Sequence, residues 1–161
     1  ERRLLTKWNT YMPARNAGLY EPEAPTAIPI LLLVHTRTLY LEATLRLYGR
    51  VRGIETTTLV ISHHGADEGV WSLVESVRFC LVRQLLFPLA SGFRGPPALK
   101  LHFAWALGHM FSEMEAAEVL YMEDDFWPTP DLYTATLWLR ARREAHCPEC
   151  VGSSASCAPS L

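Results

Sequence analysis

The sequence predicts an α/β fold with a mostly parallel sheet and helices on both of its faces. Two observations lead to this prediction. Short apolar runs alternate with helical segments from residue 28 to residue 146, as in successive strand–helix units. The first run, Ile28 to Val34, is continuously apolar, which is typical of a strand that is buried on both faces of a parallel sheet.

The elements of the first half follow from their periodicity. Between Leu41 and Gly49 apolar residues recur every three or four positions opposite a charged stripe, which predicts an amphipathic helix. The β-branched segment 57–61 is the second expected strand, and it is expected to stop at Ser62-His63-His64. Residues 70–79 then suit a helix.

The second half continues the alternation. We expect a strand over 80–87, a loop over 91–97, a helix over 99–115, a strand over 119–122 and a helix over 131–146. His102 and His109 are expected on the solvated side of the helix over 99–115. Its expected apolar face comprises Phe103, Leu107, Met110, Phe111 and Met114.

Composition and the positions of proline and glycine divide the chain into an N-terminal arm or linker (1–27), one folded domain (28–150) and a tail (151–161). Fifteen Lys and Arg residues against seventeen Asp and Glu residues give no basic face for nucleic acid. No apolar run approaches the roughly 20 residues that span a bilayer. The start lacks Met, so we interpret it as an internal cut of a longer protein.

Three groups of polar residues follow expected strands, at the edge where parallel sheets bind ligands. They are His35-Thr36-Arg37, Ser62-His63-His64 and Glu123-Asp124-Asp125. The acidic triplet is the sharpest signal, because three adjacent carboxylates repel one another unless a cation compensates them. Either a solvated acidic turn or a site for a hard divalent cation that bridges a diphosphate explains the triplet. Strand alternation would put Glu123 and Asp125 on one face.

The other two groups carry weaker signals. Arg37 offers a fork of donors that suits phosphate oxygens, although a solvated loop arginine explains it equally well. His63 and His64 are adjacent on a strand end and point apart, so a structural role is favoured over a metal site. No phosphate-binding P-loop, dinucleotide fingerprint or nucleophile elbow is present in the sequence.

Cys147-Pro148-Glu149-Cys150 has the spacing of a redox motif, but it follows a predicted helix instead of opening one. A zinc site would need further ligands, for which His146 and Cys157 have poor spacing. A local structural disulfide in an oxidising compartment is favoured, with the redox and zinc interpretations left open.

Six stretches between residues 28 and 150 carry a resemblance to a known family. The stretches are Val34-His35-Thr36-Arg37, Ile61-Ser62-His63, Phe79-Cys80-Leu81-Val82, Lys100-Leu101-His102-Phe103-Ala104-Trp105, Leu120-Tyr121-Met122-Glu123-Asp124-Asp125 with the following Pro130-Asp131-Leu132-Tyr133, and Cys147-Pro148-Glu149-Cys150. In this order they resemble the N-terminal catalytic half of the N-acetylglucosaminyltransferase II family, and their order is more specific than any one of them.

The resemblance implies a GT-A type nucleotide-sugar (Rossmann-like) fold, of which residues 28–150 would form a truncated half-domain. It implies an inverting transfer of N-acetylglucosamine from UDP-N-acetylglucosamine (UDP-GlcNAc), in β-1,2 linkage, to a mannose-terminated N-glycan on a glycoprotein, with Mn²⁺ as cofactor. It also implies a parent protein of the Golgi lumen, anchored as a type II membrane protein by an N-terminal helix that this chain lacks.

The site residues are carried over by position. Asp125 matches the last acid of the family's Glu-Glu-Asp and is the implied metal ligand. Glu123 and Asp124 match the two acids before it and are implied to bind the nucleotide-sugar. The stretch Leu33-Val34-His35-Thr36-Arg37 matches the family's Gln-Val-His-Asn-Arg, which contacts the nucleotide. Cys147 and Cys150 match a pair that is disulfide-bonded in the family.

The chain also departs from the family. Thr36 replaces Asn, Leu33 replaces Gln, and His64 stands at the position of an Asp that binds the nucleotide. A long polar insertion is reduced to the Gly92–Pro97 loop. The catalytic base and a further metal ligand are expected beyond Leu161, so this chain would hold a donor site alone. One alternative is a truncated or catalytically dead homologue that keeps at most a donor-binding module. A second is a thiol-redox protein that uses Cys147 and Cys150.

Overall fold

The computed structural model describes residues 27–35, 37–64, 67–88 and 95–152. The expected arm therefore lies outside the described residues except for residue 27, as do residues 153–161 of the tail and residues 91–94 of the expected loop. The elements in chain order are β1 (Ile30–Val34), α2 (Thr38–Tyr48), the 3-10 helix η1 (Ile54–Thr56), β2 (Thr58–His64), α3 (Glu68–Ser76), β3 (Leu81–Phe87), α4 (Pro96–Ser112), β4 (Leu120–Glu123) and α5 (Leu132–His146).

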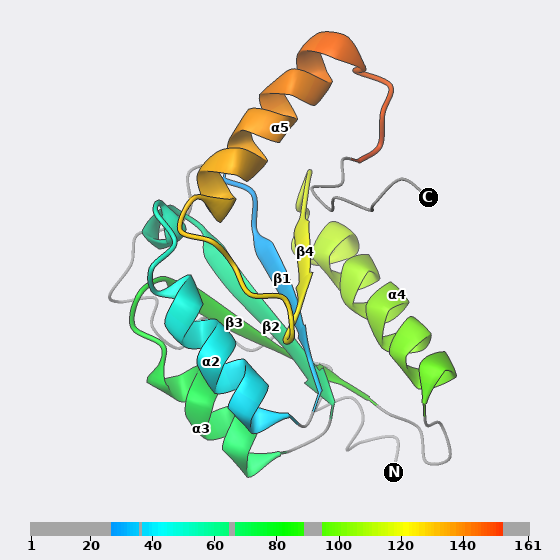
Figure 1. Cartoon of the computed structure of the whole chain (residues 1–161). Helices are drawn as coiled ribbons and strands as arrows, with labels where there is room; N and C mark the ends of the chain where they lie inside the picture. The colour runs from blue at the N-terminus through cyan, green and yellow to red at the C-terminus, as the bar shows by residue number, and fades with distance from the viewer. Residues whose placement is uncertain (1–26, 36, 65–66, 89–94, 153–161) are drawn as a thin grey trace, which may run out of the picture.

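The described strands form one parallel sheet with the order β3-β2-β1-β4. Figure 1 shows α2 and α3 side by side on one face of this sheet and α4 on the other. The predicted α/β class, the parallel sheet and the helices on both faces are thus confirmed. Since all the strands run in one direction, their carboxyl ends lie at one edge of the sheet.

The two faces of β1 enter two separate apolar cores, and every residue of the strand is buried. Ile30, Leu32 and Val34 pack with residues of α2 and α3, whereas Leu31 and Leu33 pack with residues of α4. Burial of each such side chain contributes about 1.5–3 kcal/mol, so the continuous apolar run fixes β1 in the centre of the layers.

Helix α4 differs from the prediction in the face that it buries. The buried positions are Ala98, His102, Ala106 and Met110, whereas Phe103 and Phe111 are 38% and 50% exposed. Apolar residues occur all around this helix, so periodicity cannot select one face. The small side chains of Ala98 and Ala106 let the helix backbone lie close to the sheet, and this selects the face that packs.

Strand β2 is longer than predicted and contains residues that were expected to follow it. Its pairing with β3 continues through His63 opposite Leu86 and His64 opposite Phe87. The His63 ring is fully buried and meets Trp71 of α3 edge-on, with ring centroids 5.8 Å apart. His102, expected on a solvated face, is 1% exposed and shares a 2.7 Å hydrogen bond with the Ser62 hydroxyl.

Helix α5 ends at the cysteine pair. Cys147 and Cys150 form a disulfide directly after the last residue of α5. The local disulfide predicted from the sequence is thereby confirmed. A redox-active pair typically lies at a helix N-terminus, where the helix dipole lowers the pKa of the thiol, and Cys147 lies at the opposite end of α5. Among the helices described, none has the length and apolar character needed to cross a membrane.

Candidate functional site

The candidate site lies where β1 and β4 end side by side. Leu33 of β1 pairs with Glu123 of β4, and the amide of Asp124 donates a 3.1 Å hydrogen bond to the carbonyl oxygen of Leu33. The residues that follow these two strands therefore meet at the carboxyl edge of the sheet, although almost 90 residues separate them in the sequence. Parallel α/β sheets bind their ligands at this edge.

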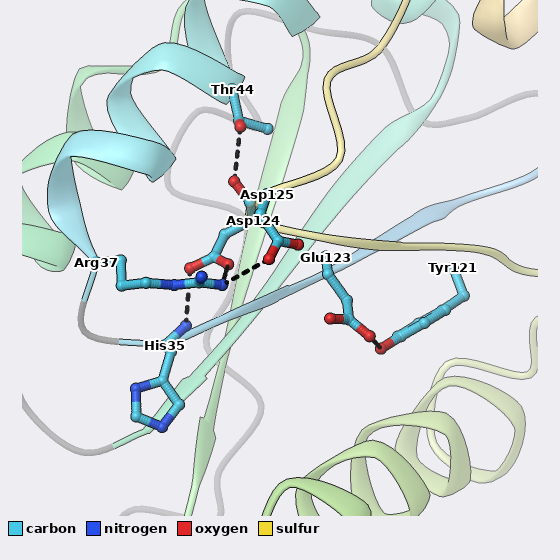
Figure 2. A network of polar contacts seen from close by, with 7 residues as sticks. All are labelled: His35, Arg37, Thr44, Tyr121, Glu123, Asp124 and Asp125. Atoms are coloured by element: carbon cyan, nitrogen blue, oxygen red, sulfur yellow. Dashed lines mark hydrogen bonds and ion pairs between the residues drawn. The ribbon is translucent and has the colours of Figure 1, made fainter.

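Asp124 is the most buried acid of the triplet, at 2% exposure. Its carboxylate accepts a hydrogen bond from the Arg37 guanidinium and another, of 3.3 Å, from the backbone amide of His35. Its carbonyl oxygen accepts a 2.8 Å hydrogen bond from the Thr44 hydroxyl on α2. Figure 2 shows these contacts converging on Asp124 from the end of β1 and from α2. Such partners offset the free-energy cost of burying a carboxylate.

Asp125 lies beside Asp124 but faces solvent, with 42% of its side chain exposed. Nη2 of Arg37 lies 3.2 Å from Oδ2 of Asp125, so one guanidinium bridges both carboxylates. The same guanidinium lies over the ring of Tyr40, 5.0 Å from its centroid. Desolvation lowers the pKa of Arg37, but the hydrogen bonds and charges of Asp124 and Asp125 outweigh it and raise the pKa. Arg37 is therefore a permanent cation.

Glu123 faces the other side of the sheet. Its carboxylate accepts a 2.6 Å hydrogen bond from the Tyr121 hydroxyl, and the Tyr121 ring packs edge-on against Phe103 of α4. The expectation that Glu123 and Asp125 share a face is wrong. Strand β4 ends at Glu123, so the alternation of an extended chain stops there, and the turn that follows brings Asp125 next to Asp124.

The other residues predicted to bind the nucleotide differ in how accessible their side chains are. The side chains of Leu33 and Val34 are buried in the two apolar cores, which leaves only their backbone for contact with a ligand. His35 is exposed, and Figure 2 shows its imidazole pointing away from Asp124. Thr36 lies outside the described residues, and His64 is described through its backbone, as the last residue of β2.

The predicted metal ligand can be tested against this geometry. In the described ranges no group of three or more His, Cys, Asp and Glu residues could hold a metal ion. A hard divalent cation that bridges a diphosphate needs only one or two carboxylates, because phosphate oxygens and waters complete its shell. Asp125, an exposed carboxylate at the ligand-binding edge, fits that role, and the buried Asp124 does not.

Sequence reasoning missed Thr44 and Tyr40. Thr44 is fully buried and anchors Asp124, and Tyr40 lies under the Arg37 guanidinium. A signal for Thr44 was present, since a hydroxyl at this position interrupts the apolar face that Leu41, Leu45 and Tyr48 form on α2. A buried hydroxyl needs a partner, which here is the main chain of the acidic turn.

Comparison with known sequences agrees with the resemblance that the six stretches carry. The sequence profile of the family N-acetylglucosaminyltransferase II (MGAT2) matches residues 2–94. The chain is 26% identical to the α-1,6-mannosyl-glycoprotein 2-β-N-acetylglucosaminyltransferase of Arabidopsis thaliana, over 97% of this chain and 45% of the relative. It is 24% identical to the Homo sapiens protein of the same name, over 92% of this chain and 44% of the relative. The chain thus spans less than half the length of these relatives.

Comparison with solved structures supports the fold. The crystal structure of S. aureus TarS superimposes with a TM-score of 0.52 and 14% sequence identity, over 73% of this chain and 20% of that protein. At this identity the likeness concerns the fold alone, and it agrees with the α/β, GT-A type fold that was expected.

Proposed function

Because the chain belongs to the N-acetylglucosaminyltransferase II family, we propose that it forms the donor-binding part of an inverting glycosyltransferase. The enzyme would transfer N-acetylglucosamine from UDP-GlcNAc, in β-1,2 linkage, to a mannose of an N-glycan on a glycoprotein. The names of the similar proteins support the class of reaction. The linkage, the donor and the acceptor that we give for this chain are part of what we propose.

One observation carries the proposal, namely the cluster of Arg37, Asp124 and Asp125 at the carboxyl edge of the sheet. It combines a guanidinium, which binds phosphate oxygens through a planar fork of donors, with an exposed carboxylate that suits a divalent cation. Both kinds of group suit a nucleoside diphosphate donor. The buried Asp124 fixes the position of Arg37.

The roles of the individual side chains follow from this arrangement. Asp125 would hold Mn²⁺, which when bound neutralises charge on the diphosphate leaving group. Arg37 would donate hydrogen bonds to the phosphate oxygens, and the main chain of residues 33–35 would border the nucleotide. His64 ends β2 at the same edge, where the uridine would lie. A base that removes the proton of the mannose hydroxyl would come from the part of the enzyme beyond this chain.

The disulfide between Cys147 and Cys150 is consistent with an oxidising compartment. We propose that the parent protein belongs to the secretory pathway and, as the family resemblance implies, to the Golgi lumen as a type II membrane protein.

The test is calorimetric titration of the chain with UDP-GlcNAc, first in Mn²⁺ and then in EDTA. We expect binding in Mn²⁺ that chelation abolishes. Asp125→Asn removes the charge of the proposed ligand at constant size, and it should abolish the metal-dependent part of the affinity. Glu42→Gln is the matched control, because Glu42 is an exposed carboxylate on α2 whose partner is Arg46, at 2.6 Å.

Two outcomes would contradict the proposal. Equal affinity for UDP-GlcNAc in Mn²⁺ and in EDTA would show that no metal takes part in binding. Unchanged binding by Asp125→Asn would show that Asp125 does not hold the metal. Absence of binding by the natural sequence would favour the diverged, catalytically dead homologue. In that case His64→Asp, which restores the acid of the family, tests whether the histidine disabled the site.

A further inference from the structure

We propose that Arg37 is an internal counter-ion of the acidic site, which must leave Asp125 before a divalent cation binds and then holds the diphosphate of the donor. This inference rests on the proposed function, since it concerns the same site. It adds that Arg37 leaves Asp125 before the metal binds, and that metal binding and nucleotide binding strengthen each other. The family assignment contains neither statement.

The first support is the charge of the cluster. Asp124 and Asp125 are adjacent carboxylates, and both contact the same nitrogen, Nη2 of Arg37. In the absence of any ligand, the guanidinium therefore offsets the repulsion between them. It occupies the electrostatic position that a metal ion would otherwise take.

The two contacts of Arg37 are unequal. The side chain of Asp124 is 3% exposed, whereas those of Asp125 and Arg37 are 42% and 44% exposed. Water competes poorly for the buried contact and well for the exposed one, so the ion pair with Asp125 exchanges more easily. A guanidinium has five N–H donors, which lets Arg37 keep Asp124 while it turns another donor toward a new acceptor.

The conflict arises when a divalent cation approaches Asp125. The guanidinium, whose Nη2 lies 3.2 Å from Oδ2 of that carboxylate, repels the cation and competes with it for this oxygen. Without nucleotide, metal binding must therefore turn the Arg37 donor that faced Asp125 into solvent, while Arg37 keeps its contact with Asp124. With a diphosphate present, the displaced donors of Arg37 find phosphate oxygens, so metal and nucleotide strengthen each other's binding.

The experiment measures Mn²⁺ binding to the whole chain by electron paramagnetic resonance, with no nucleotide present. Arg37→Met keeps an unbranched apolar stem and removes the charged guanidinium, and it should tighten Mn²⁺ binding roughly two- to fivefold, the effect of one exposed ion pair. The same variant should weaken UDP binding in Mn²⁺. The matched control is Arg46→Met on α2, the helix that Arg37 precedes; Arg46 pairs with the exposed Glu42 and with neither acid of the site, so the substitution should change neither value.

Unchanged or weaker Mn²⁺ affinity in Arg37→Met, including no measurable binding in either protein, overturns the inference. The proposed function fails by a different result, namely absence of Mn²⁺-dependent UDP binding by the natural sequence. The two failures are distinguishable because the Mn²⁺ titration contains no nucleotide.

A second measurement needs no substitution and therefore stands even if Arg37→Met does not fold. Phenylglyoxal modifies exposed guanidinium groups, and peptide mass spectrometry reads the modification at each arginine. Mn²⁺ alone should accelerate the modification of Arg37, UDP with Mn²⁺ should slow it, and Arg46 should be unaffected by both. A rate at Arg37 that does not respond to Mn²⁺ overturns the inference.

Discussion

The hydroxyl of Thr44, buried on α2, donates a 2.8 Å hydrogen bond to the carbonyl oxygen of Asp124. This bond joins the helix that follows β1 to the acidic turn that follows β4, across 80 residues of sequence. The helix therefore fixes the main chain of the residue that in turn holds Arg37. The position of the exposed Asp125 depends on the same turn.

Thr44→Val keeps the shape of the side chain and removes this donor. The carbonyl oxygen of Asp124 loses a buried partner, so we expect a loss of about 1 kcal/mol in the free energy of unfolding. We also expect weaker Mn²⁺-dependent binding of UDP, because the acidic turn is no longer held. Urea denaturation and calorimetry measure the two effects.

Thr136→Val is the control for this substitution, since the Thr136 hydroxyl donates to the carbonyl oxygen of Leu132 within its own helix α5. It should leave nucleotide binding unchanged. Equal effects of the two substitutions on binding would show that Thr44 does not support the site.

The buried pair of Ser62 and His102 predicts a non-additive loss of stability. Their 2.7 Å hydrogen bond joins β2 to α4, and the imidazole stacks on Phe87, with ring centroids 4.8 Å apart. Ser62→Ala should cost about 1–3 kcal/mol, because a polar ring atom loses its buried partner. The double variant with His102→Leu should be more stable than the sum of the single losses predicts, as measured by a double-mutant cycle in urea. Strict additivity would contradict the coupling.

The partial burial of His109 predicts that its contribution to the free energy of unfolding depends on pH. Burial lowers its pKa from the ordinary value of 6.5, and this effect exceeds the opposing charge of Glu113. Below pH 6.5 the unfolded chain takes up a proton that the folded chain resists, so the contribution of His109 is present above pH 6.5 and is lost as the pH falls through the lowered value. His109→Gln should therefore lose less stability than the natural sequence between pH 7.5 and 5.

Chemical denaturation at those two pH values measures the difference. His146→Gln, which removes an exposed imidazole at the end of α5, is the control. If His109→Gln and the natural sequence lose equal stability over this range, His109 does not contribute to the pH dependence.

We expect the thiol of Cys80 to be protected from thiol reagents in the folded protein. The side chain is fully buried, and burial raises the pKa of its thiol to about 12. The reactive thiolate is then a very small fraction at pH 8. Iodoacetamide should label the Cys80 peptide in urea and leave it unlabelled in buffer, as read by mass spectrometry. Rapid labelling of the folded protein would mean that the core around β3 opens readily.

The sequence determined the elements whose patterns are local. The continuous apolar run of β1 and the amphipathic pattern of α2 each identify one structure, and both were predicted within a few residues. The alternation of strands and helices then required a parallel sheet, which placed the polar strand ends at a common edge. The local cysteine pair was also predicted correctly.

Tertiary structure decided what depends on neighbours distant in sequence. Strand β2 extends to His64 because β3 offers backbone partners as far as Phe87. Helix α4 is apolar on several sides, so its contact with the sheet selected the buried face, with His102 in it. The contrast between the buried Asp124 and the exposed Asp125 depends on Arg37 and Thr44, which lie far from the triplet in the sequence. A pattern along the chain records which side chains could be buried or charged, but only the packed fold determines which of them share a partner.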